Sequence, residues 1–223
     1  MTNMNRFKGK VVTAREALST IKNGSRIFIG SGCGEPQHLI HTLVNNHHLD
    51  DIMIFQMLAH TLADYLNDDI FLQRFSVKLF FVPIKMQQAA FEGKVDYIPT
   101  YLSQLPQLFK NKQIVIDTVL IQISPPDAFG IASLGVSVDV TLEAVKSAKT
   151  VIAQINPRMP RTHGDGFLHI KDIDYLVPFE EELICIDQET VQDSTAARIA
   201  QYVRDLVDDG STLQVGYGHM PYA

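Results

Sequence analysis

The sequence predicts an α/β fold in which a doubly wound, mainly parallel β-sheet carries helices on both faces. Three observations support this prediction: short apolar runs typical of buried strands, segments between them with apolar residues at helical spacing, and turns rich in glycine or proline where the runs end. Strands that alternate with helices are typical of parallel sheets. We find no internal repeat, low-complexity tract or flexible linker in the 223 residues, and we therefore predict one domain across 1–223.

The composition excludes several classes of protein. Hydrophobic residues make up 46% of the chain and charged residues 20%, which is too apolar for a disordered chain. The net charge is −6, and no cluster of Lys and Arg offsets it, so nucleic acid is not an expected partner. No run approaches the roughly 18 apolar residues of a membrane span, and two cysteines are too few for a disulfide framework. We expect a cytoplasmic protein without a membrane partner.

The first predicted elements are a helix, a strand, a glycine-rich turn and a second helix. Thr13 and Glu16 form a capping-box pattern at the start of the first helix. An apolar run at 26–29 predicts a buried strand, and the turn at 30–36 follows it. Apolar residues then recur at helical spacing after Pro36, which suits the first turn of a helix.

The middle of the chain repeats this order. Apolar runs at 51–57 and 77–82 predict two buried strands, and 86–91 predicts a short helix. The segment 114–124 is rich in Ile and Val and predicts a long central strand. Two prolines end it, because proline cannot donate to a strand ladder.

The last third adds further strands and helices. Asp139 is expected to cap a helix that ends near residue 148, and 150–155 predicts a strand. The remaining predicted elements are two shorter strands within 172–185 separated by Pro178, a helix capped by Asp193 or Ser194, and a strand at 212–215. A further strand-to-helix turn follows at 216–221, so we expect the chain to be the front part of a longer polypeptide.

Four segments that follow predicted strands contain many glycines, prolines and polar residues. They are 30–36, 124–135, 156–166 and 216–221. In an open α/β sheet, ligands bind beyond the carboxyl ends of the strands, where loop amides and helix N-termini converge. We therefore expect these four segments to share one ligand-binding edge.

The first segment is not a convincing nucleotide loop. A dinucleotide fingerprint would need glycine where Glu35 stands, and a phosphate-binding P-loop would need a lysine that this segment lacks. Cys33 is either a nucleophile or a small buried residue in a turn. His38 and His41 lie one helical turn apart, but without a third nearby ligand they favour a polar helix face, and we predict no metal site. Cys185 lies in an apolar run and is expected in the core.

Polar residues in the next two segments have two interpretations each. Asp127 and Ser133 either hydrogen-bond a ligand or close local turns. Arg158 and Arg161 either hold a carboxylate or phosphate, or are solvated at the surface. From the residues alone, the prediction is a glycine- and proline-rich pocket on an α/β sheet.

Four motifs in this order resemble the acetyl-CoA hydrolase/transferase family, which includes 4-hydroxybutyrate and succinate:acetate CoA-transferases. The motifs are IGSGCGEP at 29–36, SPPDAFGIASLGVSVD at 124–139, INPRMPRTHGD at 155–165 and GSTLQVGYGHMP at 210–221. The resemblance implies the class I CoA-transferase fold, with two similar α/β domains and the active site between them. This chain is similar to the N-terminal domain, and the C-terminal catalytic domain is absent from it.

The resemblance also implies a mechanism. A glutamate from the second half of such proteins attacks the acyl-CoA thioester, and a glutamyl-CoA thioester then passes CoA to an acceptor acid, or water takes the intermediate in a hydrolase. The residue that matches this glutamate lies beyond residue 223, so we expect the chain alone to be inactive. Acyl-CoA and carboxylates are the implied substrates, no cofactor is expected to be permanently bound, and the implied partner is the chain's own C-terminal domain; a homodimer is compatible with the resemblance.

The implied site residues fall into two groups. The backbone N–H of Tyr217, flanked by Gly216 and Gly218, would stabilise negative charge on the thioester oxygen. No glutamate of this chain matches the nucleophile, and Glu35, Glu92, Glu143 and 180–182 are expected to be surface charges or helix caps. The residues implied to line the acyl end are Gly30, Gly32, Gly34, Pro36, Asp127, Asn156 and Gln214.

Three other interpretations stay open. The chain could be one subunit of a heteromeric CoA-transferase whose glutamate lies on a partner chain. It could instead be a non-catalytic acyl-CoA or metabolite-binding module, which would bind CoA tightly by itself. A sugar-phosphate isomerase of related fold would need a catalytic carboxylate and a phosphate loop within these residues, and we can place neither.

Overall fold

A computed structural model describes residues 9–185 and 194–216. The chain divides into two compact units, Met1–Cys185 and Ile186–Ala223. The first contains the whole β-sheet, and the second contains the helix α7 (Ser194–Arg204). The helix predicted from Ser194 is therefore confirmed, whereas Asp193 lies outside the described residues. The assignment of 1–223 to one domain stays a prediction.

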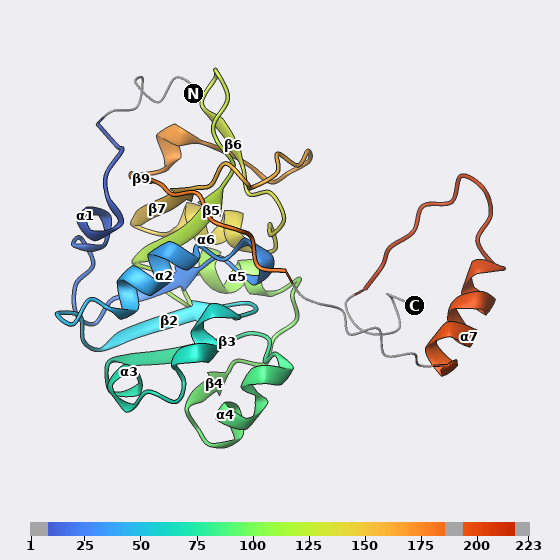
Figure 1. Cartoon of the computed structure of the whole chain (residues 1–223), viewed down its shortest axis with the longest axis horizontal. Coiled ribbons are helices and arrows are strands. Elements are labelled where there is room, and N and C mark those ends of the chain that lie inside the picture. The colour runs from blue at the N-terminus through green and yellow to red at the C-terminus, as the bar shows by residue number, and fades with distance from the viewer. Residues whose placement is uncertain (1–8, 186–193, 217–223) are drawn as a thin grey trace. The chain divides into compact units, whose positions relative to one another are not determined.

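The first unit is built on a seven-stranded, entirely parallel sheet (Figure 1). The strand order is β4-β3-β2-β1-β5-β7-β9. This confirms the predicted α/β class with a mainly parallel sheet. The strands are β1 (Arg26–Ile29), β2 (Ile52–Gln56), β3 (Phe75–Leu79), β4 (Val95–Tyr97), β5 (Thr118–Ile123), β7 (Thr150–Ile155) and β9 (Tyr175–Pro178).

Helices pack on both faces of the sheet, as the sequence predicts. In β1, Ile27 and Ile29 join a hydrophobic cluster with residues of α1, α2 and α3, whereas Phe28 joins a second cluster with residues of α5 and α6. Alternate residues of a strand point to opposite faces, so the sheet separates two cores. The helices of this unit are α1 (Ala14–Leu18), α2 (Gln37–Val44), α3 (Asp69–Arg74), α4 (Gln87–Phe91), α5 (Leu105–Lys110) and α6 (Thr141–Ser147).

The chain reverses direction across the sheet between β1 and β5. From β1 it proceeds outward through β2, β3 and β4, and it then returns to β5, which pairs with the other side of β1. Such a reversal is the topological switch point where doubly wound sheets bind ligands. A small antiparallel pair, β6 (Ile131–Ser133) and β8 (Phe167–His169), lies in the connections after β5 and β7.

Several elements differ from the sequence predictions. The segment 211–216 contains no strand, so the strand predicted at 212–215 is wrong. Only one of the two strands expected within 172–185 forms, because the chain after Pro178 leaves the sheet and bonds to side chains at the ends of other strands. Cys185 is exposed rather than in the core. The three-residue strands β4, β6 and β8 and the helices α3 and α5 were not predicted.

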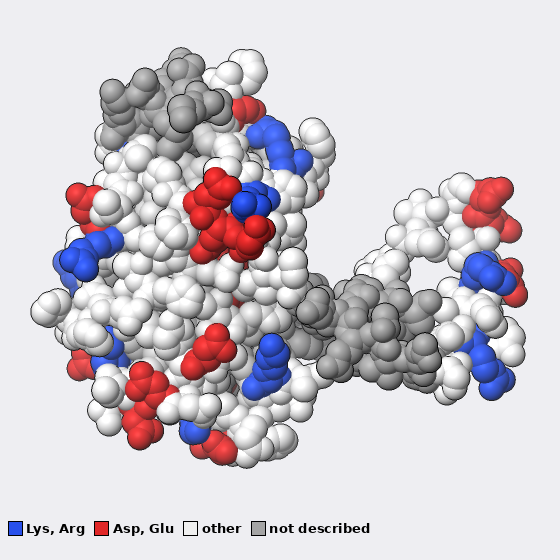
Figure 2. Space-filling model, in the orientation of Figure 1, with Lys and Arg blue, Asp and Glu red and all other residues white. Residues whose placement is uncertain are grey.

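Acidic and basic side chains are interspersed on the face shown in Figure 2. On the first unit, one group of acidic side chains surrounds a basic one. Among the described residues, no helix has both the length and the hydropathy of a membrane-spanning segment.

Candidate functional site

Three of the four predicted segments lie at the carboxyl ends of β1, β5 and β7, and glycines let them pack against one another. A Cβ atom on Gly34 would lie 2.6 Å from the Cβ of Ser137, so only glycine allows the turn after β1 to approach the segment after β5 this closely. Gly135 has a φ of +64°, and a Cβ there would lie 2.1 Å from the sulfur of Met159 in the segment after β7. The glycines therefore bring the three motifs together at the switch point.

The turn after β1 is also bonded to the turn after β2. The Gly32 N–H donates to the carbonyl of Leu58 at 2.9 Å, and the Met57 N–H donates to the Ser31 hydroxyl at 3.2 Å. Gly32 has a φ of +59°, within a short 3₁₀ turn, η2 (Gly32–Gly34). Pro36 then occupies the N-cap of α2. The predicted residues Gly30, Gly32, Gly34 and Pro36 thus form one continuous, buried turn.

Glu35 corrects the expectation of a surface charge or helix cap. Its side chain is fully buried, and its carboxylate accepts hydrogen bonds from the N–H groups of His60 at 2.6 Å and Thr61 at 2.8 Å. These residues open a second 3₁₀ helix, η3 (Thr61–Tyr65). Burial raises the pKa of Glu35 to about 7, although hydrogen bonds from Thr61, His60 and Gln56 act in the opposite direction. Burial therefore brings the pKa of this carboxyl group close to neutral pH.

A layer of buried glutamines lies beneath these turns. Gln56, Gln122 and Gln154 stand near the carboxyl ends of β2, β5 and β7, and each is at most 2% exposed. Each glutamine lies two residues after Ile54, Leu120 or Ile152 in its strand and so points to the same face of the sheet. Those three residues belong to the hydrophobic cluster on the α2 face. The Gln122 amide donates to the Glu35 carbonyl at 3.1 Å, and the Gln56 amide donates to the Gly30 carbonyl at 3.0 Å. The layer supports both ends of the glycine turn.

Asn156 extends this layer towards the end of the first unit. Its side-chain amide donates to the Gln122 side chain and to the Glu181 carbonyl, both at 2.8 Å, and its oxygen accepts from the Arg158 N–H at 3.0 Å. Gln154 donates to the Glu181 carboxylate, which also accepts from the N–H of His38 in the first turn of α2. The chain's own carboxylate thus occupies the amino end of α2.

Asp127 closes a turn and forms an ion pair. Its carboxylate accepts from the N–H groups of Phe129 and Ile131, both at 2.9 Å, and from the Arg161 guanidinium at 2.8 Å. Hydrogen bonds to the Ile131 and Phe129 backbone and the charge of Arg161 hold the pKa of Asp127 below its usual value. Ser133 accepts from the Gly135 N–H at 3.0 Å. The turn-closing interpretation of Asp127 and Ser133 accounts for these contacts.

The other reactive side chains of this edge are also occupied within the chain. Arg158 pairs with Glu180 and Glu182, at 3.2 and 2.8 Å. Burial raises the pKa of the half-buried Cys33 thiol, which disfavours the thiolate that a nucleophile needs. His38 stacks on Phe179 with 3.7 Å between ring centroids. Among residues 9–185 and 194–216, no three His, Cys, Asp or Glu side chains are arranged to hold a metal ion.

The fourth predicted segment belongs to the second unit. Gln214 and Gly216 are exposed there, in backbone without regular secondary structure. Tyr217 and Gly218 lie outside the described residues. Their proposed role in holding the thioester oxygen stays a prediction.

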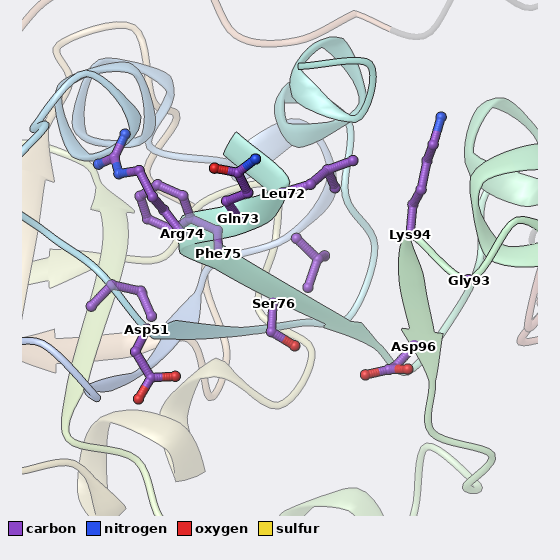
Figure 3. A pocket seen from close by; sticks show the side chains of 11 residues that line it. Asp51, Leu72, Gln73, Arg74, Phe75, Ser76, Gly93, Lys94 and Asp96 are labelled. Atoms are coloured by element: carbon purple, nitrogen blue, oxygen red, sulfur yellow. The ribbon is translucent and has the colours of Figure 1, made fainter. Parts of the chain in front are cut away.

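A cavity of about 320 Å³ lies at the opposite edge of the sheet, where β2 and β3 begin (Figure 3). Its charged side chains do not converge on a common point. The Arg74 guanidinium is bonded to the carbonyls of Val44, Asn46 and Leu49, and Lys94 pairs with Glu92. These groups are already occupied, so the cavity is a weaker candidate than the switch point.

Sequence reasoning missed Glu35 and the three buried glutamines as parts of the site. The signal is present: the strands IMIFQ, TVLIQI and TVIAQI each carry one glutamine near the carboxyl end of an otherwise apolar run. A polar residue in the buried row of a strand requires a hydrogen-bond partner, so its repetition in three strands predicts a shared polar layer.

The fold is that of an α/β protein whose clustered turns form a candidate ligand-binding edge at the switch point of a parallel sheet. Residues 1–186 match the acetyl-CoA hydrolase/transferase N-terminal domain, and the chain belongs to this family. It is 38% identical over 218 residues to a 4-hydroxybutyrate coenzyme A transferase of Clostridium kluyveri, which covers 97% of this chain and 50% of that protein. A succinyl-CoA:acetate/propanoyl-CoA:succinate CoA transferase of Fasciola hepatica is 34% identical over 224 residues. This match covers 98% of this chain and 46% of that protein.

Solved structures agree with this assignment. RipA from Yersinia pestis superposes with a TM-score of 0.84 at 28% identity, covering 96% of this chain and 52% of that one. A 4-hydroxybutyrate CoA-transferase from Porphyromonas gingivalis gives a TM-score of 0.77 at 24% identity, covering 98% of this chain and 51% of that one. This likeness confirms the predicted CoA-transferase-like fold. The chain spans about half the length of the curated relatives it matches.

Proposed function

We propose that this chain is the N-terminal half of a CoA-transferase that acts on short-chain acyl-CoA. The single observation that carries the proposal is its 38% identity, over 97% of its length, to a protein named 4-hydroxybutyrate coenzyme A transferase. Other relatives are named for succinate, acetate and butyrate, so the transferred acyl group belongs to the class of small carboxylic acids.

In the proposed reaction, a glutamate from the other half attacks the thioester carbonyl and expels CoA as the thiolate. The thiolate then attacks the glutamyl carbonyl of the resulting anhydride, releasing the first carboxylate and leaving a glutamyl-CoA thioester. An acceptor carboxylate reverses these steps and leaves as the new acyl-CoA. Water instead of the acceptor would give hydrolysis, which is the alternative outcome for this site.

Within this scheme, the chain supplies the acyl end of the site. The turn 30–36 and the segments that begin at Ser124 and Asn156 pack closely against one another at the switch point. The Tyr217 N–H would bind the developing oxyanion, with Gly216 and Gly218 leaving room for the acyl group and Gln214 beside them. Asp127 and Asn156 would act mainly by holding their turns, because their polar atoms are bonded within the chain.

Helix α2 is a poor phosphate site in this scheme. The Glu181 carboxylate accepts the His38 N–H at 3.3 Å, and a second anion there would be repelled. We therefore propose that the phosphates of CoA bind mainly to the other half of the protein. The protein is further proposed to work in the cytoplasm and to form a homodimer.

A transfer assay tests the proposal. The longer protein is incubated with 4-hydroxybutyryl-CoA, succinyl-CoA or butyryl-CoA, each with acetate, and acetyl-CoA is measured by chromatography. The proposal predicts acetate-dependent acetyl-CoA formation with at least one donor. Release of free CoA without acetyl-CoA would identify a hydrolase, and tight CoA binding without either product would identify a binding module.

A further inference from the structure

We propose that Glu35 is a positioning residue that holds the glycine turn after β1 against the turn after β2, and that CoA transfer requires this arrangement. This role rests on the proposed function, because it assigns the glycine turn to the acyl end of the site. Glu35 itself is not a catalytic residue, because its side chain is fully buried inside the fold.

The contacts of Glu35 join three strands. Its carboxylate accepts the N–H groups of His60 and Thr61, which follow β2. Its backbone carbonyl accepts the side-chain amide of Gln122 from β5, and its backbone N–H donates to the carbonyl of Gly32, in the turn that follows β1. One residue therefore fixes the turn in relation to the strands on both sides of β1.

No other side chain in this turn can replace these bonds. The rest of the turn between β1 and α2 consists of three glycines, Ser31, Cys33 and Pro36. The Ser31 hydroxyl is already bonded to the Met57 N–H. Without the Glu35 carboxylate, two N–H groups at the start of η3 lose their acceptor, and the turn loses a bond to its neighbour.

Two buried polar atoms of neighbouring residues are unpaired. The Gln56 Oε1 and His60 Nε2 atoms are buried and have no hydrogen-bond partner among the residues that the structure describes. Both belong to residues that contribute to the Glu35 hydrogen bonds. Polar atoms beside Glu35 are therefore unpaired even with its carboxylate in place, and its loss would add two orphaned N–H groups to them.

The titratable groups that face Glu35 are few. His60 bonds to it through its backbone, and burial together with the nearby Lys85 lowers the pKa of the His60 ring. The Cys33 thiol lies two residues away and has a raised pKa, caused mainly by burial and in a smaller part by Cys185 and by Glu35 itself. A change of charge at Glu35 will therefore act on the turn through the hydrogen bonds of Glu35 and through its effect on the pKa of Cys33.

The test compares Glu35→Gln with Glu92→Gln in the longer protein. Gln has the same shape as a protonated Glu, and Glu92 is a half-exposed residue at the end of α4. We expect Glu35→Gln to lower kcat by about 10- to 100-fold, because small displacements near reacting atoms have effects of this size. Glu92→Gln should match the wild type. The wild-type pH profile of kcat should show an ionisation near neutral pH that Glu35→Gln lacks.

Alkylation of Cys33 provides a readout that does not depend on activity. The rate of modification by iodoacetamide is followed by mass spectrometry of the peptide that contains Cys33. We expect Glu35→Gln, but not Glu92→Gln, to raise this rate several-fold, because the turn becomes looser. If Glu35→Gln does not fold, Thr61→Val is used instead. It removes the Thr61 hydroxyl, whose hydrogen bond lowers the pKa of Glu35, while keeping the backbone N–H, and it should move the wild-type ionisation to higher pH.

The outcomes separate this proposal from the function on which it rests. If the wild-type protein shows no CoA transfer, the proposed function is overturned, and so is the claim that transfer requires Glu35. The alkylation rates would still decide whether Glu35 holds the turn. A Glu35→Gln variant with wild-type kcat, pH profile and alkylation rate would overturn the positioning role. A Thr61→Val variant with an unchanged pH profile would also contradict it.

Discussion

The side-chain amide of Gln122, near the end of β5, donates a 3.1 Å hydrogen bond to the backbone carbonyl of Glu35, in the turn after β1. This bond crosses the point where the chain reverses direction in the sheet, so it joins the two halves of the fold at the proposed acyl site. Gln122 also accepts from Gln154 and Asn156 through its oxygen. One buried amide of β5 thus connects the turn that follows β1 to the end of β7 and the segment after it.

Replacing Gln122 should be costly for stability. Gln122→Met keeps the approximate volume but removes one hydrogen bond from each of three groups, the side-chain amides of Gln154 and Asn156 and the Glu35 carbonyl. We expect a loss of about 2–4 kcal/mol in the free energy of unfolding, since each buried hydrogen bond contributes roughly 0.5–1.5 kcal/mol. Urea unfolding of Gln122→Met measures this, with the exposed Gln113→Met as the control. Equal stability of the two variants would show that the polar layer is dispensable.

The buried Glu35 should make stability depend on pH. Its folded-state pKa of about 7 lies above the usual 4.5, so the folded state binds more protons, and stability falls as pH rises from about 4.5 to above 7. The shift corresponds to about 3 kcal/mol lost above pH 7. Glu35→Gln cannot ionise, so its melting temperature should change less between pH 5 and pH 8 than that of the wild type. An equal change in the two proteins would show that Glu35 does not titrate in this range.

The close approach of Gly34 and Ser137 can be tested by a clash and its relief. Gly34→Ala places a Cβ 2.6 Å from the Ser137 Cβ and should cost about 1–3 kcal/mol, as overpacking does. Ser137→Gly in the same chain should recover part of this loss, because the next atom is 3.6 Å away. Gly9→Ala, which meets no atom within 4 Å, serves as the control in thermal unfolding. A double variant no better than Gly34→Ala would contradict the close packing of the two turns.

The proposed oxyanion donor at Tyr217 is a backbone group, so only one kind of substitution removes it. Tyr217→Pro deletes the N–H and should lower kcat by about 100- to 1,000-fold, the size seen when one oxyanion donor is lost. Tyr217→Phe and Tyr217→Ala keep the N–H and should remain within about tenfold of the wild type. Steady-state kinetics of the three variants separates the roles of backbone and side chain. Equal losses in all three would assign the effect to the phenolic hydroxyl, which all three variants lack.

Local patterns predicted much of the fold. The capping box at Thr13 and Glu16 is present, and the runs at 26–29 and 150–155 form strands with these bounds. These elements were predictable because their signals are local, in the form of a cap or an apolar run. The strand expected at 212–215 had the same kind of signal but does not form in the described unit, because β-structure also needs a neighbouring strand to pair with.

The candidate site was predictable only in part. Glycines and prolines marked the turns after β1, β5 and β7, but which side chain each turn would contact depends on tertiary packing. Glu35 illustrates this, because a glutamate in a glycine turn is ordinarily solvated and only the fold places it against the N–H groups of His60 and Thr61. Asn156 and Gln122 likewise gain their partners from segments more than 20 residues away.

The central claim is that this chain provides the acyl end of a CoA-transferase whose nucleophile lies in the other half. The most direct measurement is peptide mapping by mass spectrometry of the longer protein after incubation with acyl-CoA in the absence of an acceptor acid. We predict that CoA becomes covalently attached to a glutamate beyond residue 223. A CoA adduct on any residue of 1–223, or transfer activity that proceeds without any adduct, would contradict the account.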